Sequence, residues 1–127
     1  MQVTAHFKLS EFKCKDGTEV PDKYLGNVMA LCLSLEHLRS KTQAPITIIS
    51  GYRTQSYNRT CGGATNSQHL TGRAADVRVK GVEPAEVAEI LEQLIADGVI
   101  PQGGIGVYPS QNFVHYDVRG KKARWKG

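Results

Sequence analysis

Three residues in this sequence have side chains that commonly bind a metal ion. His69 and Asp76 lie seven residues apart, and His115 follows in a later segment. Zinc accepts imidazole nitrogens and carboxylate oxygens as ligands, and three such ligands leave a fourth position open for water or substrate. Because structural zinc sites are usually closed by four protein ligands, this set predicts a catalytic Zn²⁺ ion.

The residues around this set would allow the three side chains to meet. Two ligands seven residues apart cannot share one face of a short straight helix, but Gly72 permits the chain to bend back between them. Asp76 would then project from the start of a strand, and His115 on a neighbouring strand would lie beside it. The alternative is that all three residues are structural: a loop histidine, a capping or salt-bridged aspartate and a hydrogen-bonded strand histidine.

Two further residues are candidates for contact with a substrate or with the metal ligands. Arg53 follows a predicted strand, and its guanidinium can bind a carboxylate in bidentate fashion or stabilise a developing oxyanion. A surface ion pair at the strand end is the alternative for Arg53. Asp117 lies two residues after His115, so both side chains point to the same face of a strand. Asp117 could therefore act as general base or hold the imidazole in place.

A mixed arrangement of helices and strands is predicted to position these residues. Apolar residues recur every three or four positions over 22–41 and again over 83–97, which is typical of amphipathic helices. The predicted strands are 46–50, 74–79, 104–108 and 112–118. The last two form a hairpin, which disfavours an all-parallel sheet. We expect an α+β fold in a single domain over residues 1–127, with a small, mostly antiparallel sheet and two main helices packed on it.

Length, charge and cysteine content narrow the class of protein. The chain has 127 residues, of which 40% are hydrophobic and 22% charged, and its net charge is +4. It has no apolar run of about 18 residues, so we expect no membrane span. The first residues lack the pattern of a secretory signal peptide. The mild positive charge favours anionic polymers, but the basic residues near the C-terminus are expected to be solvated, and we expect no nucleic-acid partner.

The cysteines predict neither a disulfide framework nor a thiolate zinc site. Cys14, Cys32 and Cys61 are odd in number and have no CxxC spacing. Cys32 falls on the apolar face of the first helix and is predicted to lie in the core. A pairing of Cys14 with Cys61 stays open at this point, and we expect the protein to be a monomer.

Several segments of the chain resemble one family. Residues 67–76 (SQHLTGRAAD) match the SxHxxGxAxD pattern of the M15 zinc peptidases, the D-alanyl-D-alanine peptidases that share a fold with the Hedgehog signalling domain. Residues 50–53 match the SGYR segment of that family. Residues 104–109 and 113–119 are similar to its small-peptidase subgroup, and the resemblance extends over nearly the whole chain.

This resemblance implies a Hedgehog/D,D-peptidase-like fold and a zinc ion held by His69, Asp76 and His115. It implies hydrolysis of stem peptides or cross-links in peptidoglycan, by endopeptidase or D,D-carboxypeptidase action. The place of action would be the bacterial cell wall, reached after release or export of a bacterial or phage protein. The predicted catalytic residues are Asp117 and Arg53. The predicted substrate-binding residues are Arg53, Ser67 and Tyr116.

One position departs from the wider family. Many members carry Glu or Asp as the general base three residues before the last zinc histidine, and this chain has Asn112 there, which cannot titrate. Asp117 is the candidate substitute. The alternative function is therefore a non-catalytic, zinc-containing cell-wall-binding or phage-structural module of the same fold.

Overall fold

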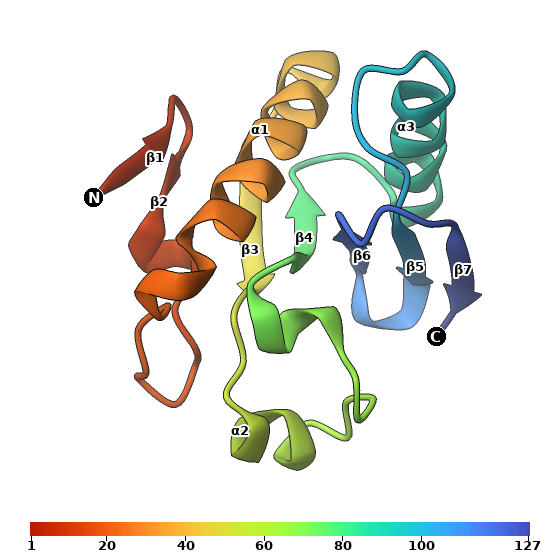
Figure 1. Cartoon of the computed structure of the whole chain (residues 1–127). Helices are drawn as coiled ribbons and strands as arrows, with labels where there is room; N and C mark the ends of the chain where they lie inside the picture. Colours follow the sequence, from red (N-terminus) through yellow and green to blue (C-terminus); the bar gives the residue numbers. More distant parts are fainter.

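A five-stranded sheet forms the centre of the computed structural model, which describes residues 1–127 (Figure 1). The strands, in their order across the sheet, are β3 (Ile46–Ser50), β4 (Ala74–Val79), β6 (Phe113–Asp117), β5 (Gly104–Tyr108) and β7 (Ala123–Lys126). The pairs β3–β4, β4–β6 and β6–β5 are antiparallel, and β5–β7 is parallel. The predicted α+β class with a mostly antiparallel sheet is thus confirmed.

Two long helices cover one face of this sheet. They are α1 (Leu25–Thr42) and α3 (Pro84–Ala96), which contact each other and both contact β4. Strand alternation turns Ala75 and Val77 of β4 toward the helices and leaves Asp76 on the other face. The largest fully buried core side chains are Tyr116, Phe7, Phe12, Leu31, Leu35, Leu38, Leu91, Leu94 and Ile105. The sheet therefore has a core face under the helices and a second face that is free to carry polar side chains.

Short elements complete the chain at both ends and around the second face. The N-terminal hairpin consists of β1 (Gln2–Thr4) and β2 (Phe7–Lys8), is followed by η1 (Leu9–Phe12), and lies beside α1. The remaining 3₁₀ turns are η2 (Asp22–Tyr24), η3 (Gln68–Thr71) and η4 (Pro109–Gln111). The short helix α2 (Gln55–Thr60) and the loop after it lie at the lower end of Figure 1, away from α1 and α3.

Two expectations from the sequence need correction. The basic C-terminal segment is not merely a solvated end, because residues 123–126 form the edge strand β7 beside β5. The first long helix begins as α-helix at Leu25 rather than at residue 22, because residues 22–24 form the 3₁₀ turn η2. No helix has both the length and the apolar character needed to cross a lipid bilayer.

Candidate metal centre

The structure brings the three predicted ligands together on the free face of the sheet. Potential ligand atoms of His69, Asp76 and His115 all lie within 4.8 Å of one another. His69 Nε2 and His115 Nδ1 are each 3.2 Å from Asp76 Oδ1. The three residues are 3%, 5% and 6% exposed, respectively. The cluster is therefore a buried centre with two imidazoles directed at one carboxylate.

Local backbone structure explains why these residues meet. Asp76 and His115 are directly opposite each other in the antiparallel pair β4–β6. His69 sits in η3, where the Ser67 hydroxyl caps the turn by accepting a hydrogen bond from the His69 amide at 3.2 Å. Gly72 ends this turn with φ of 71°, a left-handed conformation that glycine adopts without strain. The bend predicted between His69 and Asp76 is thus present.

The outer nitrogen of each imidazole has its own hydrogen-bond acceptor. His69 Nδ1 lies 2.7 Å from the carbonyl oxygen of Gly51, and His115 Nε2 lies 2.7 Å from Asp117 Oδ2. A carbonyl or carboxylate oxygen can only accept, so these nitrogens carry the proton. In the metal-binding form, with each ring protonated at this outer nitrogen alone, His69 Nε2 and His115 Nδ1 would present lone pairs on the side of Asp76. Two lone pairs and a carboxylate converging on one point form a donor set that fits Zn²⁺.

The charge state of Asp76 also suits a cation site. Burial favours the neutral acid, but hydrogen bonds from His115 and His69 outweigh it and hold the pKa of Asp76 well below its usual range. Arg53 Nη2 donates to Asp76 Oδ2 at 3.2 Å, which leaves Oδ1 facing the histidines. Asp76 is therefore an ionised carboxylate whose orientation is fixed.

Arg53 is tied to the protein by three contacts and still faces the cavity. Its Nε donates to Ser50 Oγ at 3.0 Å, and its Nη1 donates to Asn58 Oδ1 at 3.2 Å, in addition to the contact with Asp76. A guanidinium has five N–H groups, so two remain after these bonds. Arg53 also lines the cavity beside the metal centre. Arg53 thus lies beside the candidate metal ligands, where a group that binds a substrate carboxylate or an oxyanion would be needed.

Asp117 is buried behind His115 rather than exposed to the cavity. It is 0% exposed and accepts hydrogen bonds from His115, from the Gly104 amide at 2.9 Å and from Arg119 Nε at 2.9 Å. Burial opposes ionisation, but the bonds from His115 and Arg119 outweigh it and hold the pKa of Asp117 well below its usual range. A carboxylate with these partners is a poor acceptor for a proton from water. The geometry favours the second of its two predicted roles, which is to hold the imidazole.

A cavity of about 720 Å³ opens over the metal centre. Ser67, a predicted substrate-binding residue, lines this cavity. Its side chain also caps the turn η3. Tyr116 does not line the cavity, and the prediction of a substrate contact for this residue needs correction. Tyr116 is 0% exposed on the core face of β6, and its hydroxyl donates to the carbonyl of Pro101 at 2.7 Å.

Asn112 lies outside this cavity, at the turn of the β5–β6 hairpin. Its φ is 56°, in the left-handed region that asparagine tolerates better than most residues. An asparagine at this position therefore suits the local turn, whatever residue the wider family uses there.

Sequence reasoning missed an aromatic and cationic wall of the cavity. This wall consists of Tyr108, Phe113, Arg119 and Trp125. Alternation along β6 could have found part of it, because Phe113 is on the same face as His115 and Asp117. No strand was predicted over residues 123–126, so the sequence did not place Trp125 at the cavity.

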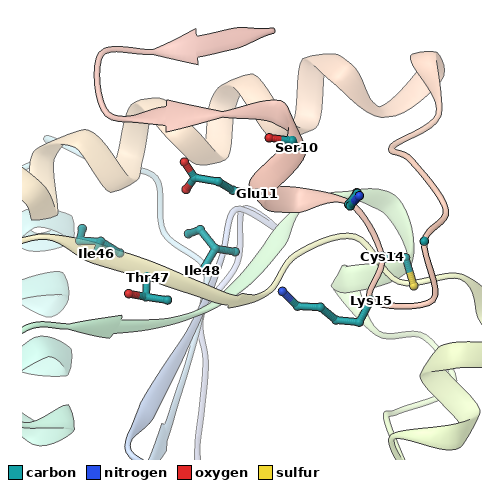
Figure 2. A pocket seen from close by; sticks show the side chains of 9 residues that line it. Ser10, Glu11, Cys14, Lys15, Ile46, Thr47 and Ile48 are labelled. Atoms are coloured by element: carbon teal, nitrogen blue, oxygen red, sulfur yellow. The ribbon is translucent and has the colours of Figure 1, made fainter.

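A second cavity of about 540 Å³ lies on another part of the surface. Figure 2 shows it between the N-terminal segment and the edge strand β3. Glu11 and Lys15 line it together with the β3 residues Ile46, Thr47 and Ile48. It contains none of the three candidate metal ligands, which all line the larger cavity.

Comparison with known proteins gives the following similarities. Residues 5–117 match the family model Peptidase M15. The chain is 39% identical over 89 residues to the probable peptidoglycan L,D-endopeptidase MepK of Haemophilus influenzae, covering 66% of this chain and 44% of that protein. It is 34% identical over 89 residues to the peptidoglycan L,D-endopeptidase MepK of Escherichia coli K12, covering 66% of this chain and 45% of that protein. The chain thus matches less than half the length of these relatives.

A solved structure also shows similarity. It is the L-Ala D-Glu endopeptidase ChiX of Serratia marcescens, with a TM-score of 0.49 and 19% identity over 76% of this chain and 86% of that chain.

Proposed function

Because this chain belongs to the peptidase M15 family, we propose that it is a zinc-dependent endopeptidase that cleaves stem peptides of bacterial peptidoglycan. The observation that carries the proposal is the convergence of His69, Asp76 and His115 beneath an open cavity. The MepK relatives are named as peptidoglycan L,D-endopeptidases, which supports peptidoglycan as the substrate and an L,D bond as the point of cleavage. The proposed place of action is the cell wall.

In this proposal the zinc ion would be held by His69 Nε2, the Asp76 carboxylate and His115 Nδ1. A bound zinc ion would supply Lewis-acid activation of a carbonyl and of water. The protein contributes fixed ligands: the Gly51 carbonyl holds the His69 ring, and Asp117 holds the His115 ring. Partners of this kind commonly change metal affinity when they are altered.

Arg53 is proposed to bind a substrate carboxylate or the developing oxyanion. Its side chain is 13% exposed and lines the cavity next to Asp76. The bonds to Ser50, Asn58 and Asp76 restrain the guanidinium before substrate arrives. A restrained donor loses little freedom on binding, which favours stabilisation of charge that develops during the reaction.

One observation favours the alternative of a non-catalytic wall-binding module. Asp76, itself a candidate ligand, is the one acidic residue that lines the cavity. Asp117 accepts bonds from His115, Gly104 and Arg119 and does not line the cavity. The lining of this cavity therefore offers no carboxylate, apart from the candidate ligand Asp76, that could act as general base.

The test is digestion of purified peptidoglycan by the zinc-loaded chain, followed by mass spectrometry of the released fragments. We expect new termini within the stem peptide, their loss after addition of a chelator, and their return when zinc is added back. His69→Ala, checked for folding by circular dichroism, is the inactive control. Release of single D-alanine would instead identify a carboxypeptidase. Sedimentation with the wall without any new terminus would identify a binding module and contradict the proposal.

A further inference from the structure

Strand β7 lies beyond residues 5–117, which match the family model, and yet it reaches the metal centre. Trp125 in β7 is the register partner of Gly106 in β5, and Gly106 is opposite His115 in β6. These residues form a row across β6, β5 and β7. Figure 1 shows these three strands side by side near the C-terminus. Trp125 and His115 line the same cavity.

The Trp125 indole crosses over Gly106 and packs on the His115 ring. The two ring centroids are 4.8 Å apart, and the ring planes are inclined by 54°. A Cβ atom at position 106 would clash with the indole Nε1 and Cε2 atoms. Glycine at this position is therefore what allows a side chain from β7 to reach β6.

Two contacts hold the indole in this position. Its Nε1 donates to the Tyr108 hydroxyl at 2.8 Å. The Arg119 guanidinium carbon lies 5.6 Å from the ring centroid, within the range of a cation–π contact. Arg119 also pairs with Asp117 at 2.8 Å. The indole and the carboxylate that contact His115 thus belong to one connected cluster.

His115 is consequently restrained in two ways. Asp117 fixes the Nε2 end of the imidazole through a hydrogen bond, and Trp125 packs against the ring. Rotation of the ring about its χ angles would break one or both contacts. The ring orientation that keeps both contacts directs Nδ1 at Asp76.

We propose that Trp125 is a positioning residue of the metal site, whose packing on His115 keeps Nδ1 directed at the ion and so raises the affinity for zinc. This inference rests on the zinc site of the proposed function. It also assigns a role to the C-terminal strand: residues 123–126 complete the metal centre instead of only extending the sheet.

The test is the zinc affinity of the metal-stripped full chain, measured by competition with a chromogenic chelator. Trp125→Ala should weaken zinc binding about tenfold, at the lower end of the effect of residues that orient metal ligands. Trp125→Phe keeps a ring over Gly106 and should lose clearly less. Gly106→Ala pushes the indole away and should weaken binding in the same direction as Trp125→Ala.

Lys126→Ala is the matched control. Lys126 follows Trp125 in the same strand, is exposed and does not line the cavity. This substitution should leave zinc affinity unchanged, and circular dichroism should show that all variants are folded. Equal zinc affinity of wild type and Trp125→Ala would overturn this inference alone. A wild type that binds no zinc would overturn the proposed metal site as well.

Discussion

His115 Nε2 and Asp117 Oδ2 lie 2.7 Å apart, on two residues that face the same side of β6. This bond occupies the outer nitrogen of the imidazole and leaves Nδ1 for Asp76. The sequence alone is equally consistent with Asp117 as a base or as a support for the ring. Its complete burial and its pairing with Arg119 favour the support.

Asp117→Asn should therefore weaken zinc binding by about 10- to 100-fold, because a neutral amide is a poorer acceptor for the imidazole N–H. Peptide hydrolysis by this variant should recover when zinc is raised to saturation. The measurements are zinc affinity and turnover as functions of zinc concentration. Asp97→Asn, on an exposed residue at the end of α3, is the control. Loss of turnover at every zinc concentration with normal zinc affinity would instead identify Asp117 as the base.

Tyr116→Phe should affect stability and leave substrate binding unchanged. The Tyr116 hydroxyl donates to the Pro101 carbonyl inside the core, and loss of such a bond typically costs about 1 kcal/mol. Urea unfolding should show a lower midpoint for the variant, while KM for a stem-peptide substrate stays at the wild-type value. A raised KM with unchanged stability would contradict this expectation and support the substrate contact that was predicted from the sequence.

The three cysteines should differ sharply in reactivity. Cys61 is exposed, whereas Cys14 and Cys32 are buried, and all three are free thiols. Burial, with smaller contributions from Glu11 and Glu36, raises the pKa of Cys32 to about 12, so this thiol stays protonated at pH 8. A thiol reagent should label one cysteine rapidly in the native protein and three in denaturant. Only one reactive thiol in denaturant without reductant would reveal a disulfide between two of the cysteines.

The proximity of the three candidate metal ligands could be predicted from sequence because it depends on residue type and strand register. His115 and Asp76 become neighbours as soon as their two strands pair, and Gly72 supplies the turn that returns His69. The same alternation rule places Tyr116 on the opposite face from His115, so the burial of Tyr116 follows from the rule that placed this candidate ligand.

Strand β7 could not be predicted in the same way. Residues 123–126 form a short basic segment whose strand conformation depends on parallel pairing with β5. The packing of Trp125 on His115 also requires the absence of a side chain at Gly106. This contact involves three strands, and no local sequence pattern indicates it. Contacts of this kind arise only when the tertiary fold is known.

The most direct test of the metal centre is anomalous diffraction at the zinc absorption edge from crystals of the zinc-loaded protein. We predict one anomalous peak at roughly 2.0–2.2 Å from His69 Nε2, from an Asp76 carboxylate oxygen and from His115 Nδ1. Crystals grown without zinc and soaked in chelator provide the control. A zinc ion held by other residues, or no peak between these three side chains in excess zinc, would contradict the assignment.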